Sequence, residues 1–398
     1  MQTPNYLNKL AALALALLCS FFSFNHSKAQ TSTTGQQVTT KVITTAVPFL
    51  MIGPDSRAGA MGETGVAVAN DANAMHWNPS ALGFLDNRMG FSMSYSPWLR
   101  SLGIPDINLM YLSGYYNTGK GVIGSSLRYF SLGDIQFTDI NGTVIGNERP
   151  SEFALDVAYA LKVTPVLTSA ITLRFFNSRL SSAGDVVGDA KPVNSVAGDI
   201  SFMYNKDFKI RSAGQDLPVI FSSGVNLSNI GPKVSYTDAT SSQDFIPVNL
   251  RVGYAFKFMV DDYNSVVFTN DFNKLLVPSE GGRSDLPLLD GMFGSFNDAA
   301  GRLDDQGIPI GEGVFGEEIS EIQTSVGIEY WYREIFAARA GYFYEDPQKG
   351  ARQFITVGAG IKYNVFGLDF SYLVPIRSKN PLQNTLRFTL TYNFEPYN

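Results

Sequence analysis

The chain has 398 residues, of which 44% are hydrophobic and only 17% charged, with a single cysteine and a formal net charge of −6 at pH 7. This composition excludes a disulfide-stapled scaffold, a cysteine-ligated zinc site and a thiol redox centre, and its acidic balance argues against a nucleic-acid partner. The charged fraction is below the roughly 25% of soluble domains, and beyond the first thirty residues no apolar run reaches the roughly 20 residues of a membrane helix. The composition therefore favours a membrane β-barrel.

The N-terminus has the features of an export signal. Lys9 supplies a positive charge ahead of an apolar run over residues 10–18, and small residues follow at the end of the segment. A lipoprotein signal at Cys19 is the alternative, but a leucine precedes that cysteine where a small residue is needed. We expect residues 1–29 to be a cleaved signal peptide and residues 30–45, rich in Thr, Ser and Gln, to be a flexible periplasmic start.

Residues 46–88 form a segment rich in small residues, which we expect to fold into the barrel lumen as a hatch. Gly59, Gly62 and Gly65 recur at every third position and permit close backbone packing. Asn78 and Pro79 predict a turn. The residues to which we assign structural roles in this segment are Pro54, Asp55, Ser56, Arg57, Gly59, Met61, Gly62, His76, Trp77, Asn78 and Pro79.

From residue 89 to residue 398, bulky apolar side chains alternate with polar or small ones, as in the strands of a transmembrane barrel. The clearest case runs from Phe153 to Val163, and a second runs from Val248 to Phe256. The pattern predicts an all-β fold, an antiparallel transmembrane barrel of fourteen strands. Besides those two, the expected strands lie near 89–96, 106–116, 120–132, 168–180, 193–204, 217–228, 264–273, 321–332, 335–344, 352–363, 365–374 and 384–394.

Charges and connection lengths distinguish a barrel from a soluble β-sandwich. A charge that faces lipid at mid-membrane costs about 2–4 kcal/mol, so charges within strands should face the lumen. The expected connections also alternate between long and short, as outer loops and periplasmic turns do, except at 205–216. The charges on the phase opposite the bulky apolar residues are Arg128, Asp156, Lys162, Arg174, Asp199, Arg251, Asp271, Glu329, Arg339, Lys362, Asp369 and Arg387.

The longest expected extracellular loop, 274–320, combines many acidic residues with a group of apolar ones. Loops of this length are usually functional or disordered. One interpretation is a solvated acidic lid. The other is a partner-docking surface, whose candidate residues are Leu286, Leu289, Met292, Phe293 and Phe296.

The segment before the strands carries a resemblance to known families. The Ala- and Gly-rich stretch that leads to residues 78–82, followed by about fourteen strands, is similar to the FadL family of outer-membrane transporters, although Ser80 stands where their Asn-Pro-Ala motif has alanine. Residues 54–62, together with residues 76–79, more closely resemble the PorV family (also called LptO), the FadL-like barrels of the type IX secretion system in Bacteroidota.

This resemblance implies a non-enzymatic outer-membrane protein, in contact with outer-membrane lipids. Its expected partners are the C-terminal signal domains of cargo proteins, the large type IX translocon barrel that releases them, and the surface attachment complex with the sortase PorU. The alternative is a FadL-like channel for hydrophobic small molecules. Cargo would meet the outer connections, which we expect at 97–105, 133–150, 181–192, 229–246, 274–320, 345–351 and 375–383.

Signatures of enzymes are missing from the sequence. There is no Gly-x-Ser-x-Gly elbow, no His-Glu-x-x-His and no phosphate-binding loop. Outside the expected signal peptide His76 is the only histidine, and it lies beside Trp77 in the hatch segment. We therefore expect no catalytic residue, no cofactor and no metal site.

Overall fold

The computed structural model describes residues 42–99, 104, 106–138, 141–180, 191–212, 215–237, 243–279, 286–299, 313–376 and 385–394. The expected signal peptide and all but the end of the expected start, 30–45, lie outside the described residues. In the described part of the chain no helix is both long and apolar enough to cross a membrane.

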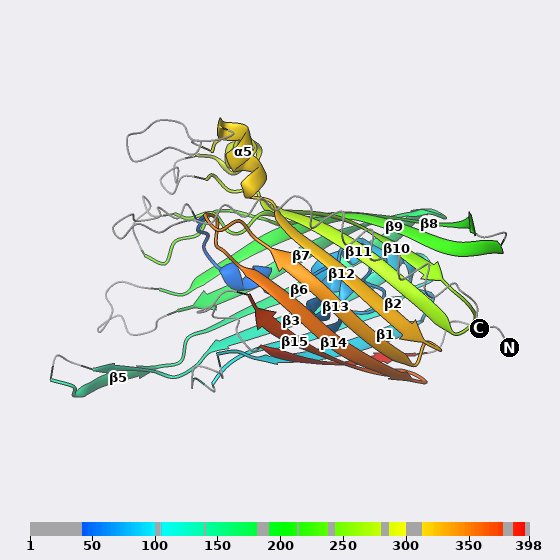
Figure 1. The fold of residues 1–398 in the computed structure, drawn as a ribbon. Coiled ribbons are helices and arrows are strands. Elements are labelled where there is room, and N and C mark those ends of the chain that lie inside the picture. The colour runs from blue at the N-terminus through cyan, green and yellow to red at the C-terminus, as the bar shows by residue number, and fades with distance from the viewer. Residues whose placement is uncertain are drawn as a thin grey trace. The chain divides into compact units, whose positions relative to one another are not determined.

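Within the described residues, fourteen strands close into one antiparallel barrel in which the first strand pairs with the last (Figure 1). This confirms the predicted fold class. The barrel strands are β1 (Met89–Pro97), β2 (Ile107–Asn117), β3 (Val122–Leu132), β6 (Ser151–Thr164), β7 (Leu167–Arg179), β8 (Val193–Ser212), β9 (Gln215–Ile230), β10 (Asn249–Met259), β11 (Asn264–Leu275), β12 (Gln323–Tyr332), β13 (Phe336–Tyr344), β14 (Gln353–Tyr363), β15 (Phe366–Pro375) and β16 (Leu386–Asn393).

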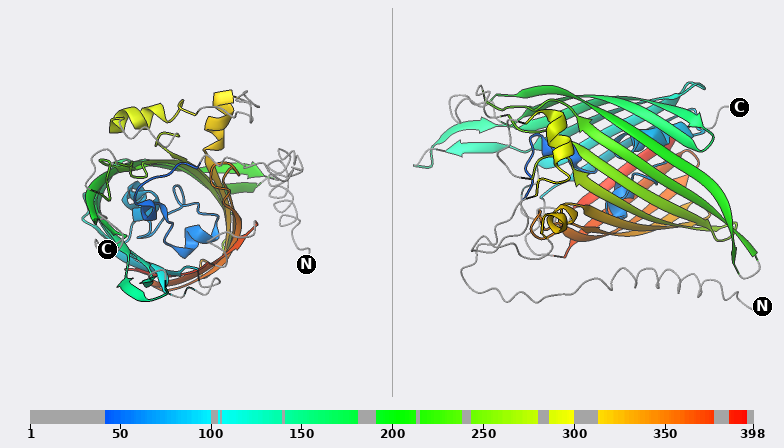
Figure 2. Two further views of the ribbon diagram at one scale, coloured as in Figure 1. Left: turned by 90° about the vertical axis from the view of Figure 1, so that its left-hand side faces the viewer. Right: turned by 90° about the horizontal axis from the view of Figure 1, so that it is seen from above.

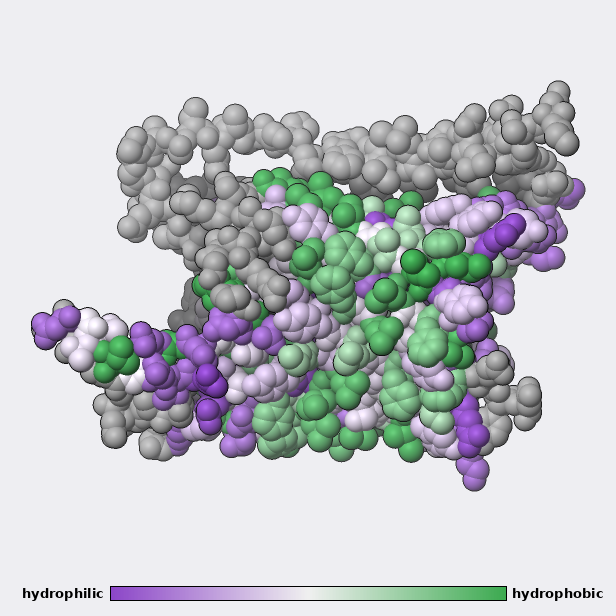
Figure 3. Space-filling view, turned by 90° about the horizontal axis from the view of Figure 1, so that it is seen from below, coloured by the Kyte–Doolittle hydropathy of each residue, from purple (hydrophilic) through white to green (hydrophobic). Residues whose placement is uncertain are grey.

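The alternating sequence pattern decides which side of the wall each residue occupies. In β3, every second side chain from Val122 to Phe130 is buried, whereas Ile123, Leu127 and Tyr129 are exposed on the outside. Figure 3 shows hydrophobic residues spread over the middle of one face of the barrel, with hydrophilic residues toward both ends. This distribution is the one expected of a wall whose middle band contacts lipid.

Long and short connections alternate around the whole barrel, so the two ends differ. One end carries short turns, among them 165–166, 260–263 and 364–365, and we call it the short-turn end. The opposite end carries connections such as 231–248 and 276–322, and we call it the long-connection end. The predicted exception at 205–216 was wrong. Strands β8 and β9 stay paired there, from Lys206 opposite Phe221 to Ser212 opposite Gln215. The hairpin extends beyond the lipid-facing band, so its residues are polar and resemble those of a loop.

The long connections hold elements that the sequence pattern did not predict. Strands β4 (Ile135–Thr138) and β5 (Val144–Glu148) pair with each other as a separate two-stranded sheet. This hairpin projects beyond the end of the barrel (Figure 1). Two short helices, α4 (Leu288–Gly294) and α5 (Gly313–Ser320), lie in the longest connection.

The chain ahead of β1 occupies the inside of the ring in the view along the barrel axis (Figure 2). It forms the 3-10 helices η1 (Pro48–Met51) and η2 (Pro79–Phe84) and the α-helices α2 (Ser56–Ala60) and α3 (Ala74–Trp77). We call residues 46–87 the luminal segment. Its first described part lies at the long-connection end, where the amide of Ala46 donates a hydrogen bond to the carbonyl of Phe245.

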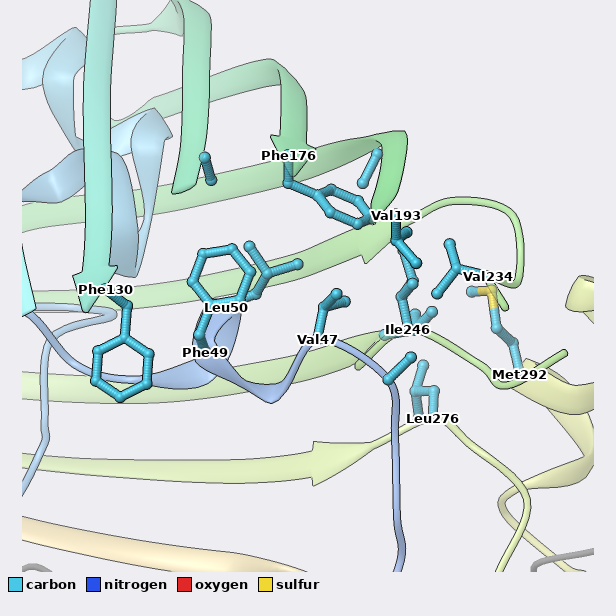
Figure 4. Close-up of a cluster of buried hydrophobic side chains, with 14 of the residues drawn as sticks. Val47, Phe49, Leu50, Phe130, Phe176, Val193, Val234, Ile246, Leu276 and Met292 are labelled. Carbon is cyan, nitrogen blue, oxygen red and sulfur yellow. The ribbon is translucent and has the colours of Figure 1, made fainter. Parts of the chain in front are cut away.

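An apolar core occupies the lumen at the long-connection end and continues from there to Met292 of α4. Val47, Phe49 and Leu50 of the luminal segment are buried there (Figure 4). The strand ends and connections around them contribute further buried side chains, among them Phe130, Phe176, Val193, Ile246, Leu276 and Met292. A second cluster farther along the lumen gathers Met75, Trp77 and Leu82 with Tyr115 and Ala158.

Candidate functional site

The residues singled out in the sequence hold the luminal segment against the inner wall, beginning with Asp55. Its carboxylate caps α2 by accepting the amide of Ala58 at 2.9 Å, and it also accepts the indole N–H of Trp77 at 2.5 Å. Burial and the neighbouring Asp71 raise the pKa of Asp55 to about 6. The next residue, Ser56, donates its amide to Thr389 of β16 at 2.8 Å. One carboxylate therefore joins two parts of the segment that lie 22 residues apart.

Arg57 links the luminal segment to the wall through a buried ion pair. Its guanidinium forms a bidentate pair with Glu329 of β12, with N–O distances of 2.9 and 2.7 Å. Glu329 also accepts from Arg339 Nε at 2.6 Å, and Arg339 Nη1 reaches Asp369 at 2.6 Å. Burial alone would lower the pKa of Arg57, but the Glu329 carboxylate raises it above the usual value. Removing one member of this network leaves an uncompensated buried charge.

The glycines at the end of α2 allow the segment to touch the wall backbone. Gly62 has a φ of +71°, and a Cβ there would lie 2.6 Å from the carbonyl oxygen of Tyr342. Its amide donates to Thr356 Oγ1 at 2.8 Å, and that hydroxyl donates in turn to the carbonyl of Ala60 at 2.9 Å. Met61 is fully buried between them. Glycine at this position satisfies both the backbone angle and the close approach.

The second half of the motif packs around His76. Arg128 donates to His76 Nδ1 at 2.6 Å and to the carbonyls of Phe49 and Leu50. Burial, followed by the cations of Arg128 and Arg251, lowers the pKa of His76 well below its ordinary value. Within the described residues we find no carboxylate or nucleophile hydrogen-bonded to this ring. A neutral imidazole that accepts from an arginine is placed as a structural acceptor.

Trp77, Asn78 and Pro79 complete the turn that enters η2. The guanidinium of Arg251 lies 4.6 Å from the Trp77 ring, and Asn78 donates to the carbonyls of Val66 and Phe202 at 2.9 and 3.1 Å. The side-chain Oδ1 of Asn78 also accepts the amide of Ser80, which caps the helix whose first residue is Pro79. The asparagine thus joins two stretches of the luminal segment to β8.

Further buried charges on the inner wall pair with one another between neighbouring strands, at about half the height of the barrel. Arg174 of β7 bonds Asp156 at 2.7 Å, Asp199 at 3.0 Å and the side chain of Asn229. Asp271 of β11 accepts the amides of residues 65 and 66 of the luminal segment at 2.8 and 3.0 Å. The charges predicted to face the lumen are buried with two exceptions, Lys162 and Lys362.

A cavity of about 860 Å³ remains in the lumen on the side of the short turns. The luminal segment lines it with residues 67–71 and 84–87, and the wall contributes Arg339, Lys362 and the turn at 364–365. The described residues contain no group of three or more His, Cys, Asp or Glu side chains that could hold a metal ion. The cavity walls mix charged, amide and apolar groups.

The candidate docking residues of the longest connection take different positions. Leu289, Phe293 and Phe296 are exposed, and Leu286 is half-buried. Met292 is buried in the apolar core, so it supports α4 and does not offer a contact surface. Helix α5 exposes Val314, Phe315 and Ile319 as well, which are not among the residues predicted from the sequence. The signal for them is the group of apolar residues beside the acidic pair of α5.

Several solved structures are similar to the chain. The Pseudomonas putida toluene transporter TodX is 13% identical with a TM-score of 0.49, covering 87% of this chain and 99% of that one. The Ralstonia pickettii toluene transporter TbuX is 14% identical with a TM-score of 0.47, covering 87% and 98%. A Pseudomonas aeruginosa FadL homologue is 11% identical with a TM-score of 0.40, covering 86% and 98%.

The comparison with curated proteins gives no match. The family model described as type IX secretion system protein PorV matches residues 34–281. A barrel of this family is an outer-membrane component, in which short turns face the periplasm. The chain belongs to the PorV family of type IX secretion system proteins.

Proposed function

We propose that this protein is a non-enzymatic carrier of the type IX secretion system. It binds C-terminal signal domains of cargo proteins at its extracellular surface, takes them from the large translocon barrel, and delivers them to the attachment complex that contains the sortase PorU. Membership of the PorV family supports the secretion role. The remaining support comes from the way the lumen is filled.

The single observation that carries the proposal is the anchored luminal segment. A passage through the barrel requires a route along its axis, but the segment is bonded to the wall through Arg57 and Glu329, through Asp271 and through Asn78. Displacing it would break buried ion pairs, each worth about 3–5 kcal/mol when one partner is lost. A barrel with such a filling works through its outer surfaces.

The extracellular surface offers a place for an extended cargo segment. Among the described strands, β4 and β5 pair with each other in a sheet separate from the barrel, so each presents one outer edge to its surroundings. Exposed sheet edges bind extended peptides by adding a strand, with main-chain hydrogen bonds supplying affinity. Ile135 and Val144 are exposed on the hairpin and would supply apolar contacts. We propose this hairpin as one cargo-docking element.

The second candidate is a FadL-like channel for hydrophobic small molecules. The periplasmic cavity of about 860 Å³ favours it, because a ligand could leave the barrel there. An apolar ligand arriving from outside would, however, meet Asp156, Arg174 and Asp199 at mid-height. Burying an apolar molecule against charged groups sacrifices their hydrogen bonds, so this route is unfavourable.

Three strains distinguish the candidates: a deletion strain, one complemented with the native chain, and one complemented with a chain in which Ser-Gly repeats replace residues 135–148. If the protein is a carrier, the deletion strain retains cargo in the periplasm and takes up fatty acids at the normal rate. Affinity capture of the hairpin variant then recovers less cargo than capture of the native chain. The matched control replaces Lys209 and Arg211, exposed on the periplasmic hairpin, by Ser. Normal cargo display in the deletion strain, or impaired uptake alone, would contradict the carrier.

We also propose that the protein performs no chemical step. His76 is the histidine that a deacylase would need, and it is held as a neutral acceptor of Arg128. His76→Asn retains an acceptor for that arginine. We expect lipid A acylation to be the same in strains with the native chain and with H76N. A change in acylation with intact secretion would establish an enzymatic role.

A further inference from the structure

The two helices of the longest connection lie on the outside of the barrel. We define the outer cap as residues 286–299 and 313–321, which contain α4 and α5. In the view along the barrel axis both helices stand outside the ring, beside the wall (Figure 2). The side view also places α5 beyond the outline of the barrel (Figure 1).

The position of Lys274 fixes which face of the wall the cap covers. Asp271 of β11 points into the lumen, where it binds the luminal segment, and Phe272 is exposed on the outside. Because side chains alternate along a strand, Lys274 shares the outer face with Phe272. Its ammonium group bonds Glu318 at 2.9 Å and Glu321 at 2.6 Å, so α5 and the residue after it cover the outer face of β11.

Lys274 lies within the height of the lipid-facing band. Tyr330, an exposed aromatic near the periplasmic turns, is paired with Val266, and Lys274 follows eight positions farther along β11. Eight strand residues rise about 26 Å along the strand, or about 20 Å along the membrane normal at a tilt of about 40°. Since the apolar band of such barrels is about 25 Å tall, Lys274 would face the outer leaflet if the cap were absent.

The cap covers this lysine with its charged side and presents its apolar side outward. Glu317 and Glu318 of α5 are buried, and Lys349 bonds Glu317 at 2.9 Å and Glu321 at 2.8 Å. Besides the exposed Asp290 and Asn297, the cap exposes six large apolar side chains: Leu289, Phe293 (72% exposed), Phe296, Val314, Phe315 (74% exposed) and Ile319. A surface helix in water has the opposite arrangement, with its apolar face buried.

We propose that the apolar face of the outer cap lies in the outer leaflet of the membrane and contacts lipid acyl chains. Helices with exposed Phe and Leu bury such faces about 5–10 Å into the boundary between headgroups and chains. The cap continues the lipid-facing wall, since Phe272 and Val252 are exposed on the strands beneath it. It covers a stretch of wall that carries a lysine with a surface whose large exposed side chains are apolar. This inference is independent of cargo binding.

Spin labels on single cysteines test the proposal in purified protein reconstituted into phospholipid vesicles. Phe293→Cys, Phe315→Cys and Leu289→Cys each receive a nitroxide, with Cys19→Ser in every variant. Oxygen partitions into acyl chains and a nickel chelate stays in water, so their relative effects on relaxation report depth. Heat-modifiable migration on gels confirms that each variant is folded.

Two matched positions define the expected range. Ile171 is 64% exposed on the outer face of β7, and Val144 is 49% exposed on the projecting β5 strand. We expect the cap labels to resemble Ile171→Cys, with collisions with oxygen exceeding those with the chelate by at least two-fold. Labels that resemble Val144→Cys would overturn the proposal and make the cap a water-exposed surface for a protein partner. The vesicles contain no cargo or translocon, so either result leaves the carrier proposal to its own test.

Discussion

The luminal segment and the outer cap solve the same problem on opposite sides of one wall. Each is joined to the barrel by buried ion pairs, Arg57 with Glu329 inside and Lys274 with Glu318 and Glu321 outside. Inside, the large apolar side chains of the segment are buried or half-buried. Outside, the charges are buried and the apolar side chains are exposed. The position of the apolar face therefore separates the part that closes the barrel from the part that meets its surroundings.

The largest expected effect comes from breaking the inner network. Glu329→Gln leaves Arg57 and Arg339 facing each other without a carboxylate between them. We expect a loss of about 3–5 kcal/mol in the free energy of unfolding, measured by urea titration in detergent. The control is Glu334→Gln, because its exposed pair with Lys257 at 3.9 Å contributes about 0–1 kcal/mol. Equal losses of unfolding free energy in the two variants would show that the inner ion pairs do not stabilise the barrel.

The two regions should respond to pH with opposite signs. The pKa of Asp55 is raised to about 6, so folding favours its protonated form. Stability from this group is complete below the unfolded pKa of about 4 and is lost as the pH rises toward 6, by up to about 3 kcal/mol. We expect Asp55→Asn to abolish this slope while keeping the helix cap. A native chain with no decline from pH 4 to 6 would contradict it.

In the outer cap the sign is reversed. Burial opposes ionisation of Glu321, but its hydrogen bonds with Lys274 and Lys349 hold the pKa of Glu321 below its usual range. The attachment of the cap is therefore complete above the unfolded pKa and weakens as the pH falls below it. Amide hydrogen exchange of α5 measures this directly. After correction for the intrinsic rate, we expect α5 to exchange faster at acidic pH than at neutral pH. Faster exchange at neutral pH would contradict the role of the ion pairs.

Close packing of the luminal segment predicts a smaller effect. Gly62 and Gly119 both have left-handed backbones, with φ of +71° and +79°, but only the Cβ of residue 62 would meet another backbone. Gly62→Ala should cost about 1–3 kcal/mol more than Gly119→Ala, because both share the backbone strain and only one is overpacked. Urea titrations of the two variants measure the difference, and equal values would contradict the close approach.

The smallest expected effect concerns the attachment of the outer cap. Lys274→Met removes one partner of Glu321 and leaves Lys349 bonded to it. We expect α5 to exchange amide hydrogens about ten-fold faster, which corresponds to about 1.4 kcal/mol, with the unfolding of the barrel unchanged. Lys257→Met on the periplasmic side is the control. Unaltered exchange of α5 would show that other contacts hold the cap.

The barrel could be predicted because the alternation of side chains within each strand shows which of its faces contacts lipid. Alternation is local, so β3 or β6 reveals its lipid-facing side without knowledge of its neighbours. The direction of the lumen charges followed from the same rule. The hairpin β4–β5 was missed because its strands are short, and the end of β8 because polar residues on a strand outside lipid look like a loop.

The ion pairs could not be predicted, because their partners are distant in the sequence. Arg57 and Glu329 are 272 residues apart, and Lys274 and Glu318 are 44 apart. Several acids in each region compete as possible partners, and only the closed barrel selects among them. The buried charges and exposed apolar side chains of the outer cap could not be predicted for the same reason. From the sequence alone, Glu317 and Glu318 look like solvent-facing charges, because their partners Lys349 and Lys274 are distant in the chain.

A disulfide that locks the luminal segment to the wall tests most directly whether the protein works through its outer surfaces. Ser56 Oγ and Thr389 Oγ1 lie 3.1 Å apart, so the pair Ser56→Cys and Thr389→Cys is placed to close a bond between α2 and β16. A carrier with a permanently filled lumen predicts that cells with the oxidised pair display cargo at the native level. Cargo that accumulates in the periplasm when the pair is oxidised, and is released on reduction, would show that the luminal segment must move.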